Sequence, residues 1–159
     1  MRRFEYAPNL LLEMAYTRQR AMLLIGGLEM QINLHLLKLV TVPMPDQFRH
    51  WRQELKTWLT TIAAIRLKPT TRPGTARFYQ QLLFDELFDE PFGDNEQQAM
   101  TMRLQLLHEQ YGGLIPNLDI DDLVARLRTF HQRFATVCAT GLLDSAGINV
   151  LLDDFIGHR

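Results

Sequence analysis

The amino-acid sequence predicts an all-α protein, a compact single-domain helical bundle of five to six helices that covers residues 1–159. Three observations lead to this prediction. Apolar residues recur at spacings of three and four, which is the period of a helix. Prolines and glycines divide these periodic stretches into segments of helical length. No stretch shows the alternation of apolar and polar residues that indicates a half-buried strand.

Length and composition agree with one globular domain. The chain has 159 residues, of which 47% are hydrophobic and 22% charged, as in an ordinary globular protein. No apolar run approaches the roughly 20 residues of a transmembrane helix, and the N-terminus lacks the apolar core of a signal peptide. Cys138 is the only cysteine, so no intrachain disulfide can form. We therefore expect a cytoplasmic protein without a membrane partner.

The first predicted helix starts at Pro8-Asn9 and ends before Pro43. Its expected apolar stripe consists of residues spaced at near-multiples of a helical turn: Leu12, Tyr16, Leu23, Met30, Leu34 and Leu37. Gly26-Gly27 interrupts this stripe, and each glycine costs about 1 kcal/mol relative to alanine inside a helix. The glycine pair predicts either one bent helix or two separate helices.

The second predicted helix has the clearest pattern in the chain. Asp46 is expected to be its N-cap, and the helix ends at Lys68-Pro69. Its seam alternates spacings of three and four residues: Phe48, Trp51, Leu55, Trp58, Ile62 and Ile65. The seam predicts a buried face with both tryptophans as core anchors. Residues 69–75 are expected to form a loop.

Three further helices and a short last one complete the predicted bundle. A third helix covers about residues 76–90, and a fourth runs from a cap at Asp94 or Asn95 to Gly112-Gly113. The fifth starts within residues 119–122 and ends at Gly141, with a second seam: Leu123, Leu127, Phe130, Phe134 and Val137. Asp144-Ser145 is expected to cap a last helix through Phe155.

Charge divides the chain into a basic half and an acidic half. Residues 1–79 carry 12 Lys and Arg against 5 Asp and Glu, a net of +7. Residues 80–159 carry 5 against 13, a net of −8, although the whole chain has a net charge of only −1. The opposed charges predict an electrostatic partner, a second copy in a head-to-tail arrangement, or pairing of the halves within one chain.

An acidic segment with three phenylalanines is the candidate protein-binding site. Its carboxylates crowd the C-terminal turn of the third predicted helix, where the helix dipole already presents partial negative charge. They also form like-charged pairs four residues apart, which are unfavourable. Either internal cations or a basic partner protein would relieve the repulsion. The candidate residues are Phe84, Asp85, Glu86, Phe88, Asp89, Glu90 and Phe92.

A basic stripe in the N-terminal half is the candidate nucleic-acid-binding site. Arg49, Arg52 and Lys56 follow i, i+3, i+7 spacing on the second helix, and further cations continue through the loop. Such stripes bind phosphate backbones, but no known nucleic-acid-binding motif accompanies this one. A solvated or internally paired face is the other interpretation. The full set is Arg49, Arg52, Lys56, Arg66, Lys68, Arg72 and Arg77.

Few residues are spaced in a way that indicates a catalytic or metal-binding site. Ser145 and Cys138 are the only Ser or Cys nucleophile candidates, and we expect a helix cap for the first and a buried, inert thiol for the second. His50 and Glu54 stand four residues apart, which predicts either a helix-surface contact or part of a metal site. His131 is expected at the boundary of the core. We therefore expect no catalytic residue, metal or cofactor.

Together these patterns favour a non-catalytic cytoplasmic interaction protein, an accessory or regulatory factor. It would bind another protein, or a second copy of itself, through oppositely charged faces. Nucleic-acid binding through the basic N-terminal half is the alternative. A metal-binding helical-bundle enzyme that uses His50 and Glu54 is the less favoured third interpretation.

Overall fold

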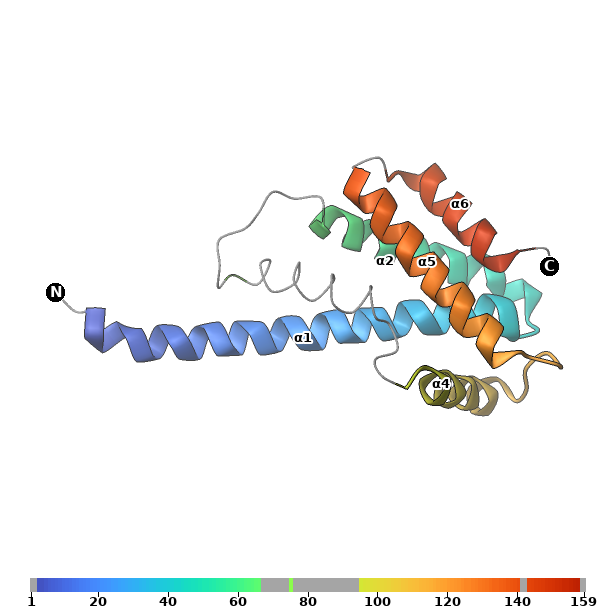
Figure 1. Cartoon of the computed structure of the whole chain (residues 1–159), viewed down its shortest axis with the longest axis horizontal. Helices are drawn as coiled ribbons and strands as arrows, with labels where there is room; N and C mark the ends of the chain where they lie inside the picture. Colours follow the sequence, from blue (N-terminus) through green and yellow to red (C-terminus); the bar gives the residue numbers. More distant parts are fainter. Residues whose placement is uncertain (1–2, 67–74, 76–94, 141–142, 158–159) are drawn as a thin grey trace.

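A computed structural model shows an all-α helical bundle, as the spacing of apolar residues predicts (Figure 1). It describes residues 3–66, 75, 95–140 and 143–157, without the side chains of residues 3–18, 21, 22, 25, 65 and 66. The elements are α1 (Arg3–Thr41), the short 3₁₀ helix η1 (Pro45–Gln47), α2 (Phe48–Arg66), α4 (Glu96–Tyr111), α5 (Ile120–Thr140) and α6 (Ser145–Ile156). Within these residues there is no strand, and no helix is both long and apolar enough to cross a membrane.

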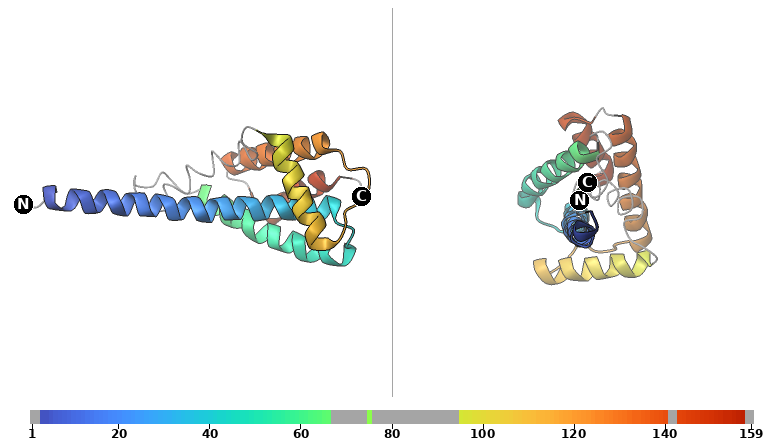
Figure 2. Two further views of the ribbon diagram at one scale, coloured as in Figure 1. Left: turned by 90° about the horizontal axis from the view of Figure 1, so that it is seen from below. Right: turned by 90° about the vertical axis from the view of Figure 1, so that its left-hand side faces the viewer.

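Helix α1 is the central element of the bundle. Its C-terminal part contacts α2, α4, α5 and α6, and these helices surround it when α1 is viewed end-on (Figure 2). Every residue from 32 to 42 is buried, whichever side of the helix it lies on. A helix that is buried all round is a core helix. The N-terminal part of α1 extends well beyond the other labelled helices (Figure 1).

The structure corrects the predicted start of α1 and decides between the two alternatives at its glycine pair. The helix begins at Arg3 rather than at Pro8, so the predicted start is wrong and Pro8 lies in the second turn, where a proline removes one backbone hydrogen bond. Of the two alternatives at Gly26-Gly27, the structure has one continuous helix rather than two separate helices, since the modest cost of two glycines does not outweigh helix formation on both sides.

The predicted apolar stripe of α1 is only half correct. Leu34 and Leu37 are buried, whereas Leu23 is 72% exposed and Met30 is 50% exposed. The spacing of these residues is regular, but the other described helices cover only the C-terminal part of α1. The remaining stripe positions, Leu12 and Tyr16, lie outside the described side chains.

The seam of α2 is confirmed at its described positions, with two additions, and the Ile65 side chain lies outside the described residues. Trp51, Leu55 and Ile62 are buried, while Trp58 is half-buried. The ring centroids of Trp58 and His35 lie 4.6 Å apart, and the two rings are nearly perpendicular. Phe48 is also half-buried. The buried face is wider than the seam, because α2 contacts α1, α5 and α6; it includes Leu59 and Ala63.

The start of α2 differs from the prediction. Asp46 lies inside the 3₁₀ helix η1, so it is not the N-cap of α2. Pro45 stands at the first position of η1, where its missing N–H donor is tolerated. The turn of η1 therefore leads the chain directly into α2.

Polar caps start the later helices as predicted. The side chains of Asn95, Asp119 and Asp144 each accept a hydrogen bond from the backbone N–H three residues later. Helix α4 ends at Gly112, whose φ of 73° suits a residue without a Cβ. The seam of α5 is buried apart from Val137, which is half-buried, and Cys138 is buried as expected.

Several sequence predictions lie outside the described residues. They are the third helix at 76–90, the end of the second helix at Lys68-Pro69, the loop at 69–75 apart from the exposed Thr75, and the helix end at Gly141.

The burial of α1 predicts that alanine substitutions at two leucines have very different effects on the free energy of unfolding. Leu37 is fully buried, so Leu37→Ala should lower the free energy of unfolding by about 2–5 kcal/mol. Leu106→Ala on the exposed side of α4 should change it by no more than about 0.5 kcal/mol. Urea denaturation followed by circular dichroism measures both, and equal losses would contradict the central position of α1.

Candidate functional site

A basic groove lies between the start of α2 and helix α6. Its volume is about 560 Å³, and its lining combines cationic, amide and apolar side chains: Pro45, Phe48, Arg49, Arg52, Gln53, Lys56 and Asn149. The amphipathic pattern of α2 positions the three cations, because the face with Trp51 and Leu55 is buried and the cations lie on the face beside it. Helix α6 supplies the facing wall.

Arg52 joins the two walls of the groove. Its Nη1 lies 2.8 Å from Oδ1 of Asp153, and its Nη2 donates to Oδ1 of Asn149 at 3.3 Å. The interaction with Asp153 pairs a cation of the basic half with a carboxylate of the acidic half. Within the groove, this ion pair orients the Arg52 guanidinium against α6.

The other two cations of the groove, unlike Arg52, have no carboxylate partner among the described residues. Arg49 is exposed and Lys56 half-buried, and among the described residues neither forms an ion pair. Their charges therefore face the groove and solvent. An anionic group entering the groove would meet two cations that no described carboxylate neutralises.

The groove brings together only part of the predicted nucleic-acid-binding set. Arg49, Arg52 and Lys56 share it, whereas the Arg66 side chain and Lys68, Arg72 and Arg77 lie outside the described residues. The predicted protein-binding set lies outside them as well: Phe84, Asp85, Glu86, Phe88, Asp89, Glu90 and Phe92.

The sequence interpretation missed both amides of the groove. Gln53 follows Arg52 directly, so a search for amides beside the cations would have found it. Asn149 meets Arg52 across 97 residues of sequence, and no local spacing predicts such a contact.

Glu54 contacts two histidines at the junction of α1 and α2. Its Oε1 lies 2.6 Å from Nε2 of His50, which confirms the predicted His–Glu contact on the helix surface. Its Oε2 lies 2.7 Å from Nε2 of His35. Among the described residues, no group of three His, Cys, Asp or Glu side chains is arranged to hold a metal ion.

His35 experiences opposing influences at this junction. Burial, helped by the charge of Lys38, lowers the pKa of His35, although the Gln31 carbonyl and Glu54 act in the opposite direction. The neutral imidazole is therefore favoured more than in water. Its ring also packs edge-on against Trp58, which fixes α1 against α2.

A buried polar chain connects α1 to α5. Asn33 donates from Nδ2 to Oε1 of Glu29 at 2.5 Å, and its Oδ1 lies 2.6 Å from Nε2 of His131. Both Asn33 and His131 are fully buried, so the predicted boundary position of His131 is wrong. The reason is that α5 packs this histidine directly against the central helix, where Asn33 offers a polar partner.

Burial raises the pKa of Glu29 to about 7, against the opposing effects of the Arg103 charge and the Asn33 hydrogen bond. Near neutral pH the folded protein therefore keeps a proton that the unfolded chain has released. The sequence offered no signal for this, because Glu29 lies on a stretch of α1 whose burial depends on the tertiary structure.

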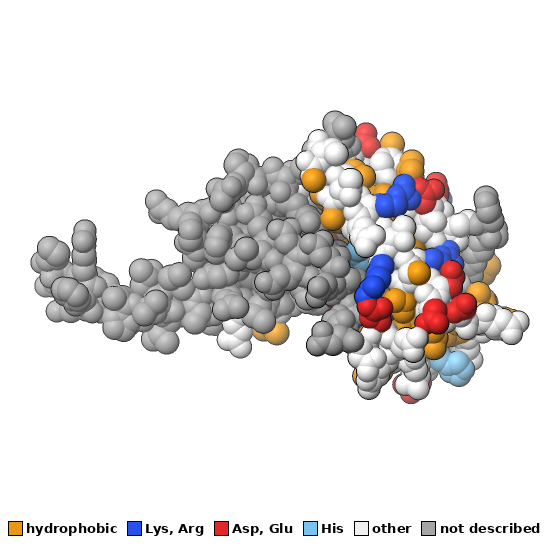
Figure 3. Space-filling view, in the orientation of Figure 1, with side chains coloured by type: hydrophobic (Ala, Val, Ile, Leu, Met, Phe, Trp, Pro, Cys, Tyr) orange, Lys and Arg blue, Asp and Glu red, His pale blue; other side chains and the backbone are white. Residues whose placement is uncertain are grey.

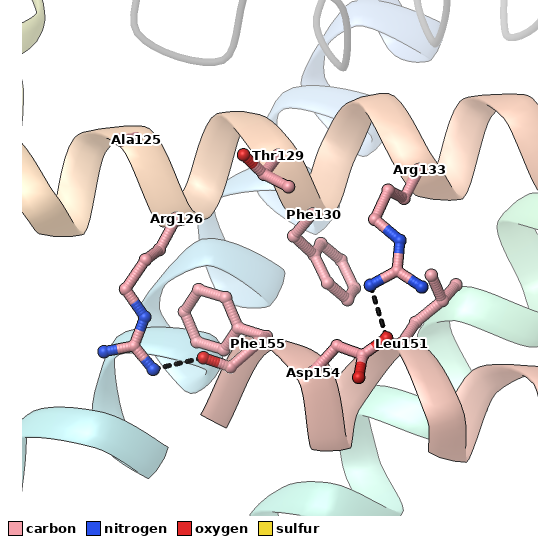
Figure 4. Close-up of a pocket in the computed structure, with 8 residues that line it drawn as sticks. All are labelled: Ala125, Arg126, Thr129, Phe130, Arg133, Leu151, Asp154 and Phe155. Carbon is pink, nitrogen blue, oxygen red and sulfur yellow. Dashed lines mark hydrogen bonds and ion pairs between the residues drawn. The ribbon is translucent and has the colours of Figure 1, made fainter. Parts of the chain in front are cut away.

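A second hollow lies between α5 and α6 (Figure 4). It has a volume of about 180 Å³, and two arginines of α5 flank it. The Arg126 guanidinium donates to the carbonyls of Phe155 and Ile156, and thereby satisfies backbone acceptors at the end of α6. Nη1 of Arg133 lies 2.5 Å from Oδ2 of Asp154. Both cations are engaged with α6, so this hollow is less suited to an anion than the basic groove.

Ion pairs also connect charges within the acidic half. Arg128 pairs with Glu96 and Arg126 with Asp122. Blue and red side chains accordingly lie next to one another over the bundle in the space-filling view (Figure 3). The arginines of α5 are therefore balanced locally, in contrast to Arg49 and Lys56.

The raised pKa of Glu29 predicts a pH-dependent stability. As pH rises from 4.5 to about 7, folding becomes less favourable because the folded state holds the Glu29 proton more tightly than the unfolded state does. Glu29→Gln keeps a carbonyl acceptor for Asn33 but does not titrate. Its stability relative to the unchanged protein should therefore increase over this range, by an amount on the order of 3 kcal/mol.

Urea denaturation of both proteins at a series of pH values measures this difference. The lowered pKa of His35 makes the protein lose stability as pH falls below 6.5, but this contribution is common to both proteins and cancels. Parallel curves of stability against pH would contradict the assignment to Glu29.

Comparison with protein-family models, with curated proteins and with solved structures finds no match for this chain. The residues of the basic groove, rather than a relative, therefore supply the evidence that bears on function.

Proposed function

We propose that this protein is a non-catalytic interaction protein that binds an acidic segment of another protein in the basic groove between α2 and α6. The observation that carries this proposal is the convergence of Arg49, Arg52 and Lys56 on one groove with Asn149. In this proposal the protein is an accessory or regulatory factor of the cytoplasm that recognises its partner through charge complementarity.

The composition of the groove favours a peptide ligand. Arg49 and Lys56 would pair with carboxylates, each exposed pair contributing about 0.2–1 kcal/mol. The amides of Gln53 and Asn149 can hydrogen-bond to a peptide backbone. Phe48, which is half-buried in the groove lining, adds an apolar surface.

The positions of the two nucleophile candidates agree with a binding role. Cys138 is 3% exposed within the core, where a thiol behaves as a small hydrophobic group. Ser145 is the first residue of α6 and directly follows Asp144, the residue that caps the helix. The predicted capping role of Ser145 is therefore wrong, since Asp144 caps the helix, whereas the burial of Cys138 agrees with the prediction.

Nucleic-acid binding is the second candidate function, favoured by the spacing of the three cations. They occupy successive turns of one helix face along the groove, an arrangement that can follow a phosphate backbone. Asp153 beside Arg52 would repel phosphates and carboxylates alike, so the amides and Phe48 of the groove lining, rather than this charge, favour a peptide over a nucleic acid.

Fluorescence anisotropy with a labelled polyglutamate peptide and a labelled single-stranded oligonucleotide tests both functions. We expect the peptide to bind at about 50 mM salt and more weakly at about 200 mM. Arg49→Gln combined with Lys56→Gln should weaken this binding roughly tenfold, equivalent to about 1.4 kcal/mol, since it removes the two cations that no described carboxylate neutralises.

The matched control is Gln105→Glu combined with Gln132→Glu. It makes the same change in net charge at exposed positions on α4 and α5, so it should leave the affinity nearly unchanged. Equal losses in both variants would overturn the groove as the binding site. Tighter binding of the oligonucleotide that disappears with Arg49 and Lys56 would establish the second candidate instead.

A further inference from the structure

The N-terminal part of α1 carries an exposed apolar face. Leu23, Gly26, Gly27 and Met30 follow i, i+3, i+4, i+7 spacing, which places them on one side of the helix. Leu23 is 72% exposed and Met30 50%, and Leu24 beside them is 53% exposed. This face lies before the buried segment that starts at residue 32.

Packing among the residues that the structure describes does not explain the two glycines of this face. A Cβ atom added to Gly26 or Gly27 would meet nothing within 4 Å. Both residues are helical, in a conformation that alanine adopts more favourably. Their flat surface between two large apolar side chains would, however, allow another helix to approach closely.

The face is symmetric about the midpoint of the glycine pair. Leu23 precedes Gly26 by three residues, and Met30 follows Gly27 by three residues. A two-fold axis through this midpoint would cross two copies of α1 at the glycines. It would place Leu23 of each copy against Met30 of the other, which is the reciprocity of an isologous interface.

From this symmetry we infer that α1 forms a homodimer through the face of Leu23, Gly26, Gly27 and Met30, with the two helices antiparallel. The occupant of the face is a second copy of this chain, because one patch supplies both sides of the contact. The inference concerns a different surface from the basic groove and does not depend on the function proposed for it.

Charge complementarity supports a second copy as the occupant. In an antiparallel pair, the N-terminal part of each α1 runs towards the bundle of the partner. Residues 1–28 carry four arginines and two glutamates, a net of +2, whereas residues 95–157, which include α4, α5 and α6, carry four arginines against eight Asp and Glu, a net of −4. The arrangement therefore brings the basic end of one α1 towards a bundle in which α4, α5 and α6 together are acidic.

The molar mass of the full chain, measured by light scattering over a range of concentrations, tests the inference. We expect a dimer that dissociates on dilution. Leu23→Glu combined with Met30→Glu should give a monomer with unchanged helical content, because both positions are exposed. Met102→Glu combined with Leu106→Glu is the matched control at exposed positions of α4, and it should remain dimeric.

Replacement of the glycines separates dimerisation from folding. Gly26→Ala combined with Gly27→Ala should raise the melting temperature of the diluted protein, because alanine favours the helix. The same change should weaken the dimer at least about tenfold, because the added methyl groups keep the two helices apart.

Three results would overturn the inference: a monomer at every concentration, a dimer that resists Leu23→Glu with Met30→Glu, or an alanine variant that dimerises as tightly as the unchanged chain. Arg49→Gln with Lys56→Gln should leave the mass unchanged. The light-scattering and anisotropy measurements therefore test the homodimer and the peptide-binding groove separately, and one hypothesis can be wrong while the other is correct.

Discussion

The complete burial of residues 32–42, the C-terminal part of α1 and the residue that follows it, is the constraint on which the rest of the bundle depends. This segment is not purely apolar, and each polar group buried within it needs a partner inside the protein. Asn33 meets His131 of α5, and His35 meets Glu54 of α2. The Lys38 ammonium lies 5.4 Å from the ring centre of Tyr111 at the end of α4. Each of three surrounding helices is thus oriented by one polar residue of α1.

The same constraint produces the basic groove. Because α2 turns its seam towards α1, its cationic face must point away from the core. Helix α6 then packs against both α2 and α5, and its buried residues include Ile148, Leu151 and Phe155. The pair between Arg52 and Asp153 is partly exposed, and such pairs contribute little to stability. Apolar burial therefore holds α6 in place, while the ion pair sets the orientation of Arg52.

The bundle also accounts for the contrast between the two parts of α1. Where α2, α4, α5 and α6 surround the helix, even Asn33 and Thr41 are fully buried. Before residue 29, large apolar side chains such as Leu23 and Leu24 are exposed. One continuous helix thus combines a core segment with a surface that has the pattern of a helix interface. The opposed charges of the two halves are joined by Arg52 and Asp153, while Arg49 and Lys56 remain turned outward.

The sequence by itself determined the features that depend on neighbouring residues. Asn95 and Asp144 cap their helices, and the seams of α2 and α5 face the core, because capping and helical periodicity act within a few residues. Only the tertiary structure decided which part of α1 is buried, how deeply His131 lies, and that Asn149 faces Arg52. These outcomes depend on contacts between residues about a hundred positions apart. A periodic pattern shows that a helix has an apolar face, but it does not show how far along that face the neighbouring helices extend.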